Sequence, residues 1–159
     1  MHPSQQDIAS QIVTVDACSS ETAGAPALIV AAGAGDATKV TGQSINRLVN
    51  GAMANSAQIS TAFLAALTAA KTLSLAHEIQ ESADGSSWDA AEVLQAATVV
   101  ETGAGNKRGT HAPAALALDL TKRKQYFRVN VTPDLSNTAT DTATFHTQAV
   151  LAGFDVLPQ

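Results

Sequence analysis

LSLAHEIQESADGSSW, residues 73–88, is the stretch of sequence that decides the fold. Its first ten residues alternate between two sides of an extended chain, which is the period of a β-strand and not of a helix. One side carries Leu73, Leu75, His77, Ile79 and Glu81. The Asp84-Gly85 pair that follows is a strong turn signal, because glycine takes positive φ freely and aspartate tolerates it. The segment therefore predicts a long strand that ends in a tight turn.

Strand-like runs recur on both sides of this segment, with turn-forming residues between them. The clearest is Tyr126–Thr132, in which aromatic and β-branched residues alternate with polar ones. The other runs are residues 11–17, 27–31, 38–45, 93–94, 97–100, 114–120 and 138–151. Breaks are predicted at 24–26, at 33–36, at a polar, glycine-rich hairpin loop over 103–109, and at 133–137. About eight short strands without a βαβ rhythm predict an all-β chain, folded as one β-sandwich or jelly-roll-like domain.

Residues 56–70 fit a helix and a strand equally well. Their side chains fall on one helical face (Ile59, Phe63, Leu67, Ala70) or on one strand face (Ile59, Thr61, Phe63, Ala65, Leu67). Alanine favours the helix. The neighbouring sequence favours the strand, because residues 68–71 would then form a hairpin turn into a strand at 72–75. We expect the strand.

The apolar composition is unusual in its make-up. The hydrophobic fraction is 45%, but 32 alanines and 17 threonines stand against one tryptophan, one tyrosine and four phenylalanines. Large side chains supply most of the apolar area per residue, so an alanine-rich interior yields little free energy of burial. Either the monomer is marginally stable, or contacts with other subunits supply part of its stability. This composition is the first indication of an assembly component.

Charge and cysteine content exclude several classes of protein. The net charge is −5, and a nucleic-acid partner would require clustered Lys and Arg. The cationic cluster Lys122–Lys124, with Arg128 nearby, is expected to be a solvated turn before a strand. The lone Cys18 excludes an intrachain disulfide and is expected to be a small buried hydrophobe. Neither a signal sequence nor 18 continuous apolar residues are present, so we expect synthesis in the cytoplasm and no membrane partner.

The candidate sites for chemistry are weak. Residues 103–109 depart from the phosphate-binding loop pattern, because Lys107 precedes the last glycine and no helix follows. The histidines form neither HxH nor HExxH; they are His2, His77, His111 and His146. Two carboxylate alternatives stay open, a glycosidase-like pair and a calcium loop over 134–141; the carboxylates are Asp119, Asp134 and Asp141. We therefore predict no catalytic, cofactor-binding or metal-ligating residue, no cofactor and no enzymatic activity.

Two segments share a recognisable pattern. Residues 72–88 form a strand that leads into a QxSxDGSxW-like turn, here QESADGSSW. Residues 126–133 contain RVNVT, and residues 149–158 end the chain on AVLAGFDVLP, with Ala152-Gly153 where the pattern has two glycines. Together these segments, spread over residues 44–158, resemble the small capsid decoration (cement) proteins of tailed bacteriophages. The turn motif alone also occurs in carbohydrate-binding and fibronectin-like sandwiches.

The resemblance implies a structural virion protein. Such a protein binds the outer capsid surface, often as a homotrimer, and stabilises the capsid by bridging adjacent subunits of the major capsid protein. Residues 26–159 would be the decoration domain, and residues 1–25 an extended N-terminal arm to a neighbouring subunit or a frayed terminus. The alternatives are another virion subunit, such as a tail-tube or head–tail connector protein, and a carbohydrate-binding module that uses Trp88 and Tyr126 as aromatic platforms.

Overall fold

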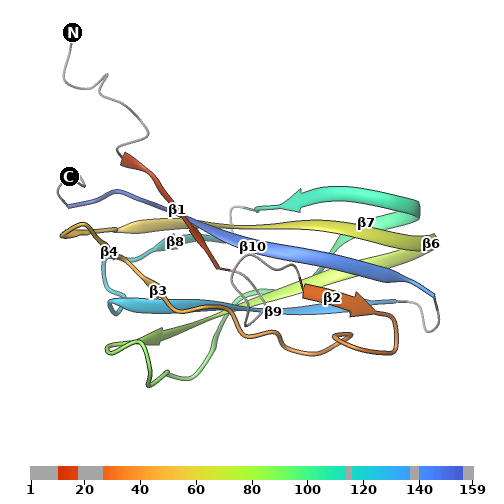
Figure 1. Cartoon of the computed structure of the whole chain (residues 1–159), viewed down its shortest axis with the longest axis horizontal. Coiled ribbons are helices and arrows are strands. Elements are labelled where there is room, and N and C mark those ends of the chain that lie inside the picture. The colour runs from red at the N-terminus through yellow and green to blue at the C-terminus, as the bar shows by residue number, and fades with distance from the viewer. Residues whose placement is uncertain (1–10, 18–26, 114–115, 137–139, 156–159) are drawn as a thin grey trace, which may run out of the picture.

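The computed structural model describes residues 11–17, 27–113, 116–136 and 140–155, and this part of the chain is built of strands (Figure 1). In chain order they are β1 (Val13–Asp16), β2 (Ala27–Val30), β3 (Ile45–Asn46), β4 (Leu48–Val49), β5 (Ala52–Met53), β6 (Ser56–Ser82), β7 (Glu92–His111), β8 (Ala117–Asp119), β9 (Tyr126–Leu135) and β10 (Thr142–Ala152). Across these ranges, no helix has the length and apolar character needed to span a membrane.

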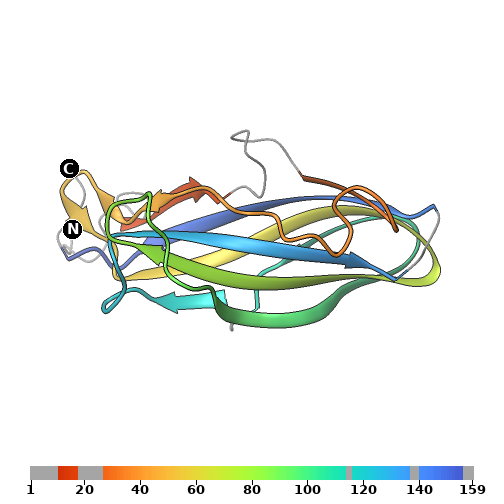
Figure 2. The same ribbon diagram turned by 90° about the horizontal axis from the view of Figure 1, so that it is seen from below.

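The long strand β6 bends back at its middle and takes part in both layers of a sandwich (Figures 1 and 2). Its residues 56–66 pair with β10, whereas residues 73–82 pair with β9. β7 follows the same bend, with 105–111 on the first half of β6 and 92–103 on the second. Two paired strands therefore run through both layers as one folded ribbon.

Each layer of the sandwich has its own strand order. In the first sheet, β1 and β2 lie end to end along β10, followed by the first half of β6, and then by β8 and the second half of β7. In the second sheet, the order is β3, β9, the second half of β6 and the first half of β7. The predicted all-β, sandwich or jelly-roll-like fold is confirmed, and the 56–70 segment is a strand.

The bend in β6 replaces the hairpin turn predicted at 68–71. The register between β6 and β7 shifts between Leu67 and Lys71, and Ala70 takes a φ of 62°. The Asp141 carboxylate, which is buried at the start of β10, accepts hydrogen bonds from the Thr68 backbone N–H at 2.9 Å and its hydroxyl at 2.6 Å. The corner is thus fastened by a side chain from a distant strand, which local turn chemistry does not reveal.

The glycine-rich loop predicted over 103–109 is wrong, because these residues lie inside β7. Gly109 is directly opposite Phe63 of β6, and a Cβ atom at residue 109 would lie 2.5 Å from the Phe63 Cζ atom. Gly105 has a φ of 80° beside the bend, a conformation that glycine adopts without strain. These glycines therefore allow close packing and bending within a strand and do not form a loop.

The interior is less alanine-rich than the composition suggested. Among the buried hydrophobic residues of the described chain, 17 of 25 are leucine, isoleucine, valine or phenylalanine. Phe127 and Phe145 are the largest fully buried side chains. Most of the 32 alanines therefore lie outside this core. The predicted alanine-rich interior is therefore only partly right for the described residues: 8 of the 25 are alanine, as many as leucine, but the larger side chains form the majority.

Strand boundaries differ from the expectations in two places. β9 continues through Pro133 to Leu135, although a break was predicted at 133–137. Proline is tolerated because the Pro133 carbonyl accepts from Ala37 N–H on the side away from β6, so the missing N–H does not interrupt the β6–β9 pairing. The run at 38–45 is mostly not a strand: Val40 forms an isolated bridge with Val131, and β3 begins only at Ile45.

The first 25 residues are described only in part. Val13–Asp16 form β1, which pairs antiparallel with β10 of the same chain. This part of the predicted arm is therefore built into the first sheet. Residues 1–10 and 18–25, including His2 and Cys18, lie outside the described residues, so the arm stays a prediction for them.

Arg47 joins the end of the sandwich to its neighbouring loops. This buried side chain donates to the backbone carbonyls of Ala54 at 3.2 Å, of Arg123 at 2.7 Å and of Leu120. Each carbonyl belongs to a segment outside the long strands. One buried cation thus satisfies the carbonyl groups of three segments that converge beside β4, β5 and β8.

Candidate interaction surface

His77 of β6 and His111 of β7, which were candidate site residues in the sequence, lie next to each other in the interior although they are far apart in the sequence. His77 Nε2 lies 3.0 Å from the Thr61 hydroxyl, and His111 Nε2 lies 2.8 Å from Gln95 Oε1. Thr61 and His111 are cross-strand partners in the first sheet, and His77 and Gln95 are partners in the second. We call these four residues the polar square, because its two hydrogen bonds cross from one sheet to the other.

The polar square is largely shielded from water. His77 and Thr61 are fully buried, and the His77 ring stacks on the His111 ring with centroids 5.8 Å apart. Burial, together with the nearby His111, lowers the pKa of His77 to about 4. Burial also lowers the pKa of His111. His77 and Glu78 point to opposite faces, as predicted, since Glu78 pairs with Lys39 at 2.6 Å on the outside.

The basic turn at 122–124 is neutralised within the chain. Arg123 lies 2.5 Å from both Glu81 and Glu92, and Lys124 lies 2.7 Å from Asp89. The hydrogen bonds that Arg123 donates to Glu92 and, to a lesser extent, to Glu81 raise the pKa of Arg123. The predicted solvated turn is confirmed, and its charges are not arranged as a free patch for phosphates.

The aspartates proposed as carboxylate sites do not converge. Asp119 lies opposite Ser56, at the start of β6, whereas Asp141 binds Thr68 at the bend, about 40 Å further along an extended strand. Asp134 pairs with Ser74 in the other sheet. No group of three potential metal ligands occurs among the described residues, which include Asp134 and Asp141 but not 137–139.

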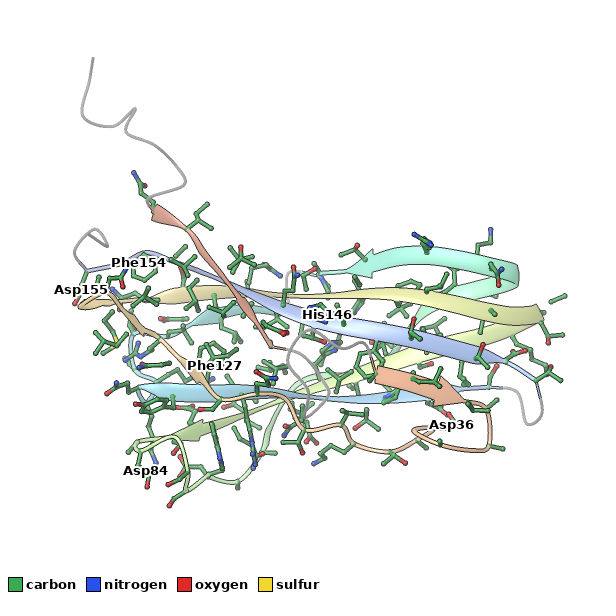
Figure 3. The ribbon with its side chains drawn as sticks, in the orientation of Figure 1. Asp36, Asp84, Phe127, His146, Phe154 and Asp155 are labelled. Carbon is green, nitrogen blue, oxygen red and sulfur yellow. The ribbon has the colours of Figure 1, made fainter. Side chains whose placement is uncertain are left out.

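Loop aspartates instead hold turns (Figure 3). Asp84, in the predicted turn after β6, accepts from the backbone N–H groups of Ser86 and Ser87 at 2.8 Å, and these bonds lower its pKa. Asp36, in the loop after β2, accepts from Leu135 N–H at 2.9 Å and ties this loop to β9. The Asp84-Gly85 turn is confirmed, with Gly85 at a φ of 76°.

The aromatic platform required by a carbohydrate-binding module is partly covered. The guanidinium of Arg128 lies 4.3 Å from the centroid of the Trp88 ring. Arg128 also donates to Gln80 Oε1 at 3.0 Å, which fixes the side chain over the ring. One face of Trp88 is therefore occupied by a cation of the same chain and is not presented to a sugar.

The outer faces of the two sheets differ in charge. The second sheet presents ion pairs and charged side chains on its outside, among them Lys39, Glu78, Arg128 and Asp134. Part of the outside of the first sheet is a row of short or apolar side chains, which we call the uncharged face, and the exposed Arg108 of β7 borders it opposite Leu64. The row consists of Leu28, Ala62, Leu64, Ala66, Thr142 and Thr144. Leu64 and Leu28 flank Thr144 in adjacent strands and are 39% and 59% exposed.

The uncharged face also contains a shallow hollow. Its volume is about 400 Å³, and it is lined by Ala62, Leu64, Arg108, Thr144 and His146. His146 points outward beside Asp16 of β1, 3.5 Å away. An apolar surface that is hollowed and rimmed by polar side chains is typical of a protein–protein contact.

The outer edge of β7 adjoins this face. Within the described chain, β7 pairs only with β6, so the other side of a 20-residue strand has no backbone partner. The exposed Val93 and Val99, at 63% and 52%, lie on the other half of this strand, opposite Glu78 and Ser74 of the second sheet. An open edge can accept a strand from another subunit, although the register irregularities with β6 and the presence of Lys107 limit indiscriminate pairing.

The sequence did not single out the exposed residues of this surface. Leu28 belongs to a run predicted as a strand, as do Val93 and Val99, whereas Leu64 lies in the 56–70 segment, which fitted a helix and a strand. The alternation of a strand does place Leu64 on the other side of the strand from the buried Phe63 and Ala65, so the sequence contained this part of the signal. Which side of β6 faces water depends on its pairing with β10, which joins residues about 80 positions apart in the sequence.

No protein-family model and no curated protein matches the chain. Among solved structures, it is similar to the T13 viral particle of infectious bursal disease virus, with 12% identity, a TM-score of 0.50, and coverage of 89% of this chain and 31% of that one. The VP2 subviral particle of the same virus gives 12% identity, a TM-score of 0.49, and coverage of 89% and 32%. The Gx strain gives 11% identity, a TM-score of 0.48, and coverage of 93% and 34%.

The chain thus spans about a third of the length of the structures that it matches. At this level of identity the likeness concerns the fold alone. The sandwich of this chain has the architecture of a domain in a viral particle protein, with a TM-score of 0.50.

Proposed function

We propose that this chain is a structural protein of a virus particle, and that it works by docking onto other subunits and not by catalysis. The observation that carries the proposal is the uncharged face of the first sheet, with Leu28 and Leu64 exposed beside the open edge of β7. Several polar side chains that could carry chemistry are engaged in the interior or in turns, among them His77, Asp84 and Asp141. The shared fold with a viral particle protein supports the same class of function.

The specific role that we propose is decoration of a tailed-phage capsid. The QESADGSSW turn, the RVNVT strand and the AGFDVLP end support it, as they resemble decoration proteins. In this role the protein sits on the outer capsid surface of the virion, bridges adjacent subunits of the major capsid protein and associates with itself, as a homotrimer in the resembling family. It is made in the host cytoplasm and uses neither nucleic acid nor a membrane as partner.

The bridging role is supported by the short side chains on the outside of the first sheet. An apolar contact gains roughly 25 cal/mol for each Å² that it removes from water, so a sheet face rich in short side chains requires a large contact area. Each copy then contributes a weak contact, and many copies on one shell bind with avidity. A subunit that spans two neighbours also adds to the free energy that holds the shell together.

The test is to add the purified protein to capsid shells that lack it and to measure the temperature at which the shells open. We expect the wild-type protein to co-sediment with the shells and to raise this temperature. Leu64→Lys places a charge on the uncharged face and should abolish both effects. Thr132→Lys, its matched control on the outer face of the second sheet, should bind normally.

Some outcomes would contradict the decoration role, and one would contradict only the docking surface. Wild-type protein that neither binds nor stabilises shells would refute the decoration role. If the purified protein instead forms rings on its own, a tail-tube or connector subunit would be favoured. Glycan binding that is lost in Trp88→Ala would favour the carbohydrate-binding module. Equal binding by Leu64→Lys and wild type would leave the role intact and refute the uncharged face as the docking surface.

A further inference from the structure

We propose that the polar square is an acid-sensitive clasp between β6 and β7, because the His77 ring of β6 lies against His111 and Gln95 of β7, and that mild acid increases opening of this edge strand. The importance of this clasp for assembly rests on the proposed function, but the clasp itself is a property of the isolated chain. It is built from four residues of two strands: Thr61, His77, Gln95 and His111.

The clasp lies in the interior between the two sheets, away from the bend at 67–71 of β6 and at 103–105 of β7. Thr61 and His77 belong to the two halves of β6, and Gln95 and His111 belong to the two halves of β7. Each hydrogen bond of the square therefore joins the halves of one strand across the interior. Since β7 has no other strand partner among the described residues, its contacts with β6 are what hold it.

The hydrogen-bond pattern accepts a neutral His77 and leaves a protonated one without enough partners. Thr61 Oγ1 lies 3.1 Å from the hydroxyl of Thr147 on β10, and it is the one polar atom bonded to His77 Nε2. His77 Nδ1 is buried and has no hydrogen-bond partner among the described residues. An imidazolium donates from both nitrogens, so protonation would bury an unsatisfied N–H together with a charge.

No carboxylate compensates for such a charge. The titratable group that faces His77 is His111 of β7, and it would repel a proton on His77. The other groups packed here are not titratable: Val131 from β9, Thr61 from the first half of β6 and Thr147 from β10. Gln95 of β7 is also uncharged, and its side chain raises the pKa of His77 by less than burial lowers it. Glu78 and Lys39 lie on the opposite face of the second sheet.

Opening of β7 relieves this conflict. In the open state His77 reaches water and regains an ordinary pKa near 6.5, whereas in the closed state its pKa is about 4. Protons therefore favour the open state as the pH falls below 6.5. At pH 5 the two values give an opening equilibrium about 30-fold larger than at pH 7.5. His111 and Gln95 are only half-buried, so the square is approached by water from the β7 side.

The test is hydrogen exchange of the isolated protein at pH 7.5 and 5.0, corrected for the intrinsic pH dependence of exchange. We expect the opening equilibrium constant reported by the β7 amides to be roughly 30-fold larger at pH 5.0 than at pH 7.5. The constants reported by the amides of β9 and β10 should change much less. His77→Gln keeps a donor for Thr61 but does not titrate, and it should remove the acid response. His146→Gln, which alters an outward-facing histidine, is the matched control and should keep it.

A second measurement guards against a variant that does not fold. Proton NMR of the wild-type histidines should show one ring, His77, that stays neutral well below pH 6. A His77 ring that titrates near 6.5, β7 exchange that does not respond to pH, or an acid response that persists in His77→Gln would each overturn the clasp. Shell binding at pH 7.5 reports separately on the proposed function, since the clasp is closed at that pH.

Discussion

Gly109 and Phe63 give the sharpest test of the packing between β6 and β7. The two residues are directly opposite each other, and a Cβ atom at residue 109 would lie 2.5 Å from Phe63 Cζ and 3.0 Å from Cε1. Phe63 is buried, so its ring has little space into which it could move. Gly109→Ala must therefore overpack this site. Overpacking of this kind costs about 1–3 kcal/mol.

The assay is urea or thermal unfolding of Gly109→Ala with and without Phe63→Leu. For a chain of this length, the expected loss lowers the Tm by roughly 2–12 °C. In the Phe63→Leu background the alanine should cost at least about 0.5 kcal/mol less, because the two side chains couple. Gly105→Ala is the control, because residue 105 has a φ of 80° and open space around the position of a Cβ atom. Its expected cost of about 1–2 kcal/mol comes from the backbone conformation, so Phe63→Leu should not reduce it.

The reasoning has a clear counter-result. Where a glycine is replaced without strain, alanine stabilises a protein by about 0.4–1 kcal/mol through the unfolded state. A neutral or stabilising Gly109→Ala would show that Phe63 does not lie across residue 109. A cost that is unchanged by Phe63→Leu would place the strain elsewhere.

Three further predictions concern buried polar groups. Arg47→Leu should lower the free energy of unfolding by about 2–4 kcal/mol in urea titrations, because three backbone carbonyls lose a charged donor; an unchanged midpoint would refute this. Asp141→Ala should cost about 2–3 kcal/mol and speed exchange of the Thr68 amide, with Asp141→Asn retaining part of the stability; equal loss in both would contradict the role of the shared acceptor. Burial lowers the pKa of His77 to about 4, so the contribution of neutral His77 to the free energy of unfolding is complete above pH 6.5 and is lost as the pH falls toward 4. Over this range the free energy of unfolding should fall by about 3 kcal/mol more in wild type than in His77→Gln.

Local patterns predicted much of this fold because local chemistry decides it. The alternation over residues 73–82 and the Asp84-Gly85 turn are both present, since side-chain burial and positive φ act within a few residues. The RVNVT strand is β9, and the threonine-rich run is β10. The class of fold followed from these periods.

The bend and the long strands could not be predicted in the same way. Residues 68–71 look like a hairpin turn, but Asp141, 73 positions away from Thr68, turns them into a corner of a continuous strand. The glycines of 103–109 look like a loop until Phe63 is placed over one of them. In both cases a distant partner outweighs the local preference.

The candidate surface was hidden for a related reason. Leu28 and Leu64 are exposed on one face because β2 and β6 both pair with β10. The polar square forms only when the bends of β6 and β7 bring four residues together. Spacing in the sequence carries neither arrangement. The spacing of the histidines in the sequence did not predict that the rings of His77 and His111 stack.

The most direct test of the docking account is a cryo-electron microscopy map of shells saturated with the purified protein. The account predicts ordered copies on the outer surface, each with Leu28 and Leu64 of the uncharged face against the shell and each in contact with two adjacent capsid subunits. A map in which bound copies present the charged face of the second sheet to the shell, or in which saturated shells carry no copies at all, would contradict it.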